Sequence, residues 1–172
     1  MLFPVLIQTT PKILIVLLLL HPNPTSPTCS DDNGFSDPYA VLYIDGKKMG
    51  KTHVAKKTLD PVWNFHAYIP LQTDKPISLI EIFVWDKDKI SEMKLKDILM
   101  IKKDAIQDDF LGKISVPYSQ LFNLVHPSGT SLEYDSPENK EVVLTLEKRS
   151  VDDNVSGEIQ IKFGLTKTGS TV

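Results

Sequence analysis

Apolar and β-branched residues recur in short runs along most of the chain, and several of these runs alternate with polar residues. Eight such runs are bounded by Gly, Pro, Asn or Asp and predict strands. They cover residues 13–20, 39–45, 50–55, 63–69, 78–85, 110–117, 141–146 and 157–165. Many short strands without long intervening helices predict an all-β, eight-stranded antiparallel β-sandwich.

Three segments depart from this strand pattern. Residues 21–30 are rich in proline and predict an extended, exposed connection. Residues 90–107 contain no turn residues and carry apolar side chains at helical spacing, which predicts a short helix inserted between two strands. Residues 118–124 predict a further helical turn.

The first twenty residues are strongly apolar and leave three interpretations open. Residues 13–20 have the length of one buried strand, whereas a membrane-spanning helix needs ~20 apolar residues. A strand is therefore favoured over a targeting segment or an imperfect gene model. The predicted organisation is a leader over 1–12, one domain over 13–166 and a flexible tail over 167–172.

Composition narrows the range of partners. With 172 residues, a net charge of −3 and a pI near 5.8, the chain can build one core and has no basic field for nucleic acid. The single cysteine, Cys29, cannot form an intramolecular disulfide, which favours a cytoplasmic setting. No G-x-S-x-G, H-E-x-x-H or P-loop motif is present, so we do not expect an enzyme.

Acidic residues gather in segments that adjoin the predicted strands. They are Asp31 and Asp37 before the second strand, Asp86 and Asp88 after the fifth, and Asp109 at the start of the sixth. Connections at one end of a sandwich cluster in space, so these five carboxylates are expected to meet. Their mutual repulsion would then require a cation, and Ca²⁺ takes six to eight oxygen ligands in a flexible shell. The alternative is that each acidic residue only solvates a turn.

Four motifs occur in a fixed order: SDPY at 36–39, TLDPVWN at 58–64, WDKD at 85–88 and DFLG at 109–112. Over residues 31–165 the sequence resembles a C2 domain, a family of eight-stranded β-sandwiches of which many bind calcium and anionic phospholipid. A strand before the first acidic segment and the final GEIQIKFGL strand resemble the type II topology of that family. The tail is similar to the C2 domains attached to some phosphatidylserine decarboxylases.

The resemblance implies roles for the five aspartates. The first two match calcium ligands of the family's loop 1, and the other three match ligands of its loop 3. The helix predicted within 90–107 then forms a short insertion in the third calcium-binding loop, where it could bind the membrane or a protein partner.

Two further sets of residues point to lipid. Phe35 lies at the tip of loop 1, where we expect it to insert at the bilayer interface. Lys51, Lys56 and Lys57 belong to a stretch without acidic residues and are the predicted contacts for lipid headgroups. Each lysine near an anionic bilayer contributes about 1 kcal/mol, although a solvated strand face is the alternative.

The sequence thus predicts a cytoplasmic, peripheral membrane module that binds phosphatidylserine or phosphoinositide membranes in the presence of Ca²⁺. Two alternatives stay open. One is a calcium-independent C2 domain with a protein-interaction or structural role. The other is the N-terminal fragment of a phosphatidylserine decarboxylase.

Overall fold

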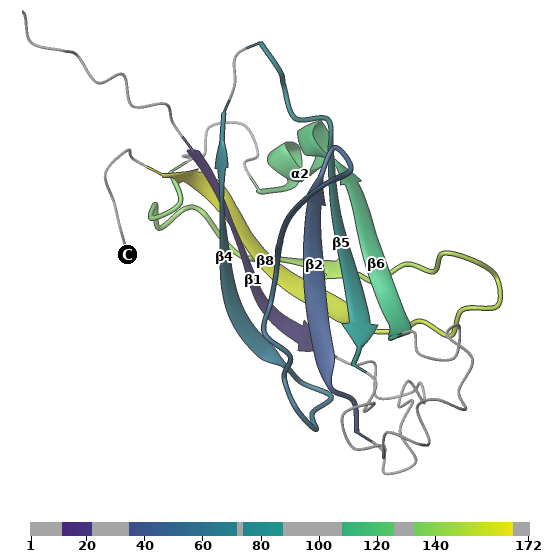
Figure 1. The fold of residues 1–172 in the computed structure, drawn as a ribbon. Coiled ribbons are helices and arrows are strands. Elements are labelled where there is room, and N and C mark those ends of the chain that lie inside the picture. The colour runs from purple at the N-terminus through teal and green to yellow at the C-terminus, as the bar shows by residue number, and fades with distance from the viewer. Residues whose placement is uncertain (1–11, 22–34, 72–73, 88–107, 126–132, 167–172) are drawn as a thin grey trace, which may run out of the picture.

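Two four-stranded antiparallel sheets face each other across one core (Figure 1). The computed structural model describes residues 12–21, 35–71, 74–87, 108–125 and 133–166. These residues form eight strands and one helix. The predicted eight-stranded antiparallel sandwich is confirmed.

The strand order shows how the chain is threaded. One sheet has the order β4-β1-β8-β7, with β4 at Val62–Pro70, β1 at Lys12–His21, β8 at Glu158–Thr166 and β7 at Val142–Thr145. The other has the order β3-β2-β5-β6, with β3 at Lys47–Lys51, β2 at Pro38–Ile44, β5 at Leu79–Asp86 and β6 at Asp109–Pro117. The first strand lies between β4 and the last strand, as the type II topology requires.

The apolar N-terminal run forms a central strand. Ile13 and Ile15 are fully buried, and the register of β1 shifts between Leu17 and Leu19 against both neighbouring strands. The strand interpretation is therefore confirmed for β1, while residues 1–11 lie outside the described part of the chain.

Alternation along the strands builds the core. In β5 every second residue is buried, so one face of the strand points inward and the other is half-exposed. In the facing sheet, β8 likewise buries Ile159, Ile161 and Phe163 at every second position. Among the described residues, the largest fully buried side chains are those of Ile13, Ile15, Pro38, Leu42, Ile80, Ile82, Val84, Leu121, Ile159 and Ile161.

The third strand is displaced from its predicted position. Asp45 and Gly46 have φ angles of 49° and 75°, and Ile44 pairs with Lys47. Two consecutive residues with positive φ are typical of the tight type I′ hairpin turn, for which Asp-Gly is a favoured sequence. The strand predicted at 50–55 was therefore placed too late, because the turn at Asp45 and Gly46 lets β3 begin at Lys47 and end at Lys51.

Helix α2 (Tyr118–Val125) confirms the predicted helical turn. Leu121 is fully buried, and the amide of Tyr118 donates to the carbonyl of Ser78 over 2.9 Å at the start of β5. This places α2 at the same end of the sandwich as the β2–β3 turn (Figure 1). The helix predicted within 90–107 lies outside the described residues. In the described part, no helix is long and apolar enough to cross a bilayer.

Candidate functional site

Three of the predicted calcium ligands stand at one end of the β3-β2-β5-β6 sheet. Pro38, which follows Asp37, pairs with Asp86, and Asp86 pairs with Asp109 on the other side. Asp37 thus directly precedes β2, Asp86 ends β5 and Asp109 begins β6. Antiparallel pairing therefore brings the three residues to adjacent positions across the sheet.

The other two predicted ligands, Asp31 and Asp88, fall in segments that the structure does not describe. Their placement stays a prediction.

Asp37 joins three segments of the chain by hydrogen bonds. Its amide donates to Oδ1 of Asp86 over 2.7 Å, and its own Oδ1 accepts from the amide of Lys57 over 2.7 Å. Its carbonyl accepts from the amide of Lys87 over 3.1 Å. Asp37 and Asp86 are only 9% and 4% exposed, so these bonds are shielded from water. They fix both carboxylates before any ligand binds.

Neither Asp37 nor Asp109 forms an ion pair with a residue that the structure describes. Lys57 offers Asp37 its backbone amide, and it does so from a left-handed conformation with φ of 53°. A bound cation is therefore a suitable counter-charge at this end of the sandwich.

The chemistry of these donors fits calcium. Carboxylate oxygens are the hard ligands that Ca²⁺ prefers. Among the described residues, no three acidic, histidine or cysteine side chains lie close enough to hold a metal ion by themselves. The described aspartates thus match the ion in donor type, but they do not form a metal site by themselves.

Asp108 has a different environment from its neighbour Asp109. Its Oδ1 lies 2.6 Å from Nζ of Lys87, and its Oδ2 accepts a hydrogen bond of 2.6 Å from the hydroxyl of Tyr39. Nζ of Lys51 lies 3.4 Å from the centre of the Tyr39 ring. Asp108 is therefore engaged with side chains of the sheet, which leaves Asp109 as the better candidate ligand of the pair.

Burial and contacts shift the pKa values in this group. Burial raises the pKa of Tyr39, and the hydrogen bond to Asp108 raises it further. Burial lowers the pKa of Lys51, while the charge of Asp108 acts in the opposite direction. Both shifts follow from packing charged and polar groups over one half-buried sheet face.

Sequence reasoning missed this face, although a signal was present. Successive residues of a strand point to opposite faces, so Tyr39 lies on the face opposite to Ala40 and Leu42, although β2 is buried on both faces. On the outside of the sheet the Trp85 and Phe110 rings meet edge to face, with centroids 5.4 Å apart.

The structure separates the predicted lipid-binding residues into two places. Phe35 is 47% exposed and lies two residues before Asp37. Lys56 and Lys57 are exposed in the β3–β4 connection beside Asp37, whereas Lys51 is exposed at the end of β3 and packs against Tyr39. Their roles in lipid binding stay predictions.

A sequence model of the C2 domain matches residues 20–136 of the chain. The chain belongs to the C2 domain family. This confirms the resemblance that the SDPY, WDKD and DFLG motifs indicated. The finer similarity to decarboxylase-attached C2 domains stays a prediction.

Two curated relatives show how the domain occurs in larger proteins. Tricalbin-3 of Saccharomyces cerevisiae is 42% identical over 59 residues, which are 34% of this chain and 4% of that protein. A probable serine/threonine-protein kinase of Dictyostelium discoideum is 31% identical over 137 residues, which are 80% of this chain and 11% of the kinase. The chain therefore spans only a small part of these relatives.

Solved structures agree on the fold. A single C2 domain of plant Extended Synaptotagmin 1 has a TM-score of 0.60 at 14% identity, covering 95% of this chain and 99% of that one. A structure with two C2 domains of Extended-Synaptotagmin 2 gives a TM-score of 0.55 at 17% identity, covering 96% of this chain and 43% of that one. At 14% and 17% identity, these likenesses show the fold. C2 domains are a non-catalytic domain type, and its homologues support membrane lipid binding as a general functional class.

Proposed function

We propose that this C2 domain docks on anionic phospholipid membranes when Ca²⁺ binds at the end of the sandwich that carries Asp37, Asp86 and Asp109. The observation that supports this most directly is the register of β2, β5 and β6, which aligns the three carboxylates. Asp31 and Asp88 are expected to complete the oxygen shell. The proposed activity is peripheral binding at the cytoplasmic face of a membrane, not catalysis.

Different residues of the chain would make different contacts with the membrane. When bound, Ca²⁺ supplies positive charge and open positions for phosphate or carboxylate oxygens of lipid headgroups. The exposed side chain of Phe35 would enter the bilayer interface beside the ion. Lys56 and Lys57, exposed near the same end, would add about 1 kcal/mol each near an anionic surface.

Co-sedimentation with vesicles tests the proposal. Wild type should bind phosphatidylserine vesicles in calcium and lose most of that binding in excess chelator or on phosphatidylcholine vesicles. Asp86→Asn and Asp37→Asn should each weaken calcium-dependent binding about tenfold or more, because each removes one negative ligand. Both variants keep an Oδ1 that can accept the amide hydrogen bonds described above, so the fold is retained.

Asp74→Asn is the matched control, because Asp74 is exposed in the β4–β5 connection at the opposite end of the sandwich. It should bind vesicles like the wild type. Vesicle binding of unchanged strength without calcium would contradict the proposal. Calorimetric titration adds a second readout, since no heat at millimolar calcium would favour a calcium-independent, protein-binding role.

A further inference from the structure

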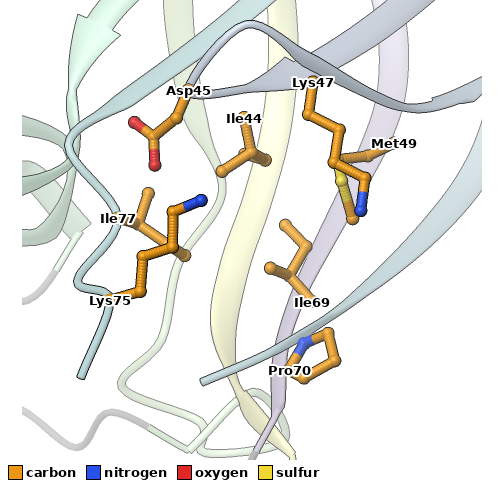
Figure 2. A pocket seen from close by; sticks show the side chains of 8 residues that line it. All are labelled: Ile44, Asp45, Lys47, Met49, Ile69, Pro70, Lys75 and Ile77. Atoms are coloured by element: carbon orange, nitrogen blue, oxygen red, sulfur yellow. The ribbon is translucent and has the colours of Figure 1, made fainter. Parts of the chain in front are cut away.

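A pocket of about 210 Å³ opens between the two sheets (Figure 2). It lies at the end of the sandwich away from Asp37 and Asp86, because Ile44 of its lining ends β2, whereas Asp37 directly precedes that strand. We call it the edge pocket, because it lies between β3 and β4, the edge strands of their two sheets. Apolar side chains of Ile44, Met49, Ile69 and Ile77 line it. Lys47 and Lys75 stand beside this apolar lining, one from each side of the opening (Figure 2).

The wall of the edge pocket is built before any ligand arrives. Oδ1 of Asp45 accepts hydrogen bonds from the amides of Ser78 and Leu79 over 3.0 and 2.8 Å. The amide of Asp45 donates to the carbonyl of Leu79 over 3.0 Å. These three bonds join the β2–β3 turn to the segment that carries Lys75 and Ile77, so the two sides of the pocket are held together.

The size of the pocket limits what it can hold. A cavity of about 150 Å³ can hold a benzene ring, whereas small-molecule sites usually measure about 300–1,000 Å³. At about 210 Å³, the edge pocket suits one bulky apolar side chain better than a whole cofactor.

The charge beside the pocket selects an acidic ligand. Neither Lys47 nor Lys75 forms an ion pair with any residue in the described part of the chain. The one acidic residue of the lining, Asp45, already directs one of its oxygens to two backbone amides. Lys48 adds a further exposed positive charge on β3.

Edge strands commonly carry lysines that discourage aggregation, which accounts for Lys47 and Lys48 without a ligand. Lys75 is not on a strand, however, and Figure 2 shows its side chain extending over the pocket toward Ile44. The lysines and the apolar lining together therefore need an explanation beyond edge protection.

We propose that the edge pocket binds an acidic segment of a partner protein, with one bulky apolar side chain inserted between Ile44 and Ile69. Acidic residues on either side of this anchor would pair with Lys47 and Lys75. The opening runs between β3 and β4, the edge strands of the two sheets, so a segment in extended conformation fits it. The choice of a protein over a lipid rests on the proposed membrane docking, which turns this end away from the bilayer.

Methyl NMR of the full chain in calcium-free buffer tests the edge pocket independently of membrane docking. The probe is the synthetic peptide Glu-Glu-Asp-Leu-Glu-Asp, titrated while the methyl signals of Ile44, Ile69 and Ile77 are followed. We expect saturable shifts of these signals that weaken with added salt. The same peptide with alanine in place of leucine should bind about tenfold more weakly. A peptide that keeps the leucine but has lysine in place of every acidic residue should not bind.

Charge-reversal variants complete the test. Lys47→Glu and Lys75→Glu should each lower the affinity for the acidic peptide by roughly three- to tenfold. Lys148→Glu, an exposed change outside the pocket lining, should leave it unchanged. Shifts confined to methyl groups outside the pocket, or equal binding of the leucine and alanine peptides, would overturn the proposal. If phosphatidylserine vesicles without calcium shift the same methyl signals more than the acidic peptide does, the proposal is overturned and the pocket is assigned a lipid ligand.

Discussion

The two ends of this sandwich use aspartate in opposite ways. At one end, Asp37 and Asp86 hold each other through a backbone amide, and Asp109 stands beside them on the next strand. At the other end, Asp45 directs Oδ1 to two backbone amides and supports a wall. The same residue type therefore concentrates negative charge at one end and builds an apolar recess flanked by lysines at the other.

The difference shows that a hydrogen-bonded aspartate is not by itself a sign of function. Each of Asp37, Asp45 and Asp86 accepts a hydrogen bond from the backbone. The two ends differ in the residues that surround the carboxylate. At the end with Asp37 and Asp86 these are further aspartates, whereas at the end with Asp45 they are lysines and apolar side chains. Substitutions that change charge without changing hydrogen bonding should therefore affect the two ends differently.

The largest expected effect is the loss of calcium stabilisation in Asp86→Asn. Calcium at a hundred times its dissociation constant should stabilise the wild type by about 2.7 kcal/mol, because it binds the folded state only. Asp86→Asn should lose most of this gain. Thermal unfolding with and without calcium measures it, and Lys75→Ala at the opposite end should keep the full gain. An equal calcium shift in wild type and Asp86→Asn would rule out this site.

The next effect concerns the wall of the edge pocket. Asp45→Ala removes the acceptor for the amides of Ser78 and Leu79 and places alanine at a positive φ, which should cost about 1–3 kcal/mol in the free energy of unfolding. Asp45→Asn keeps an oxygen acceptor and tolerates positive φ, so its cost should be far smaller. Urea unfolding compares them. Equal losses in the two variants would show that the carboxylate charge, not the acceptor, matters.

A smaller effect is expected where the sheet face adjoins the acidic end. Tyr39→Phe removes the hydrogen bond to Asp108 but keeps the ring beneath Lys51, and should cost about 0.5–1.5 kcal/mol.

The same substitution gives a test in pH. The pKa of Tyr39 is raised above the value of about 10 that it has in the unfolded chain, so its contribution is complete below pH ~10 and is lost as the pH rises further. Wild type should therefore lose stability more steeply than Tyr39→Phe above pH ~10, as followed by urea unfolding. Tyr118 and Tyr134, whose pKa values are also raised, act in the same direction in both proteins. Parallel slopes would show that the pKa of Tyr39 is the same in the folded and the unfolded chain, and would contradict the raised pKa.

The smallest expected effect is that of Asp109→Asn in the absence of calcium. Asp109 is exposed and forms no ion pair with a described residue, so the substitution should change the free energy of unfolding by no more than about 0.5 kcal/mol. Calcium-dependent vesicle binding should nevertheless fall. A large loss of stability in the chelator-treated protein would instead assign Asp109 a structural role.

Much of the fold could be predicted because it rests on local pattern. The alternation in β5 determines which of its residues are buried. Acidic residues stand next to or at the ends of β2, β5 and β6, and antiparallel pairing brings them to one end of the sheet. The start of β3 is equally local, since Asp45-Gly46 is a hairpin signal, although the predicted strand begins three residues after β3 does.

The contacts across the fold could not be predicted in this way. Tyr39 meets Asp108 from 69 positions away, and Asp45 meets Ser78 from 33 positions away. Such pairs depend on how two distant segments pack, which a single sequence does not encode in any local pattern. The edge pocket is a product of the same packing. Lys47 belongs to the lysine-rich stretch of the sequence, but no local pattern places it beside Lys75 and the apolar lining.

The central position of β1 has a consequence for how the protein is made. Its neighbours, β4 and β8, lie far along the chain, and Lys12 pairs with both Pro70 and Thr166. During synthesis the KILIVLLLLH segment therefore leaves the ribosome well before its partners exist, and its pairing with β8 must wait for nearly the whole domain. An unpaired apolar segment of this kind is prone to aggregate in the meantime. The strand order of this sheet therefore favours slow folding, because the central strand pairs only with distant segments.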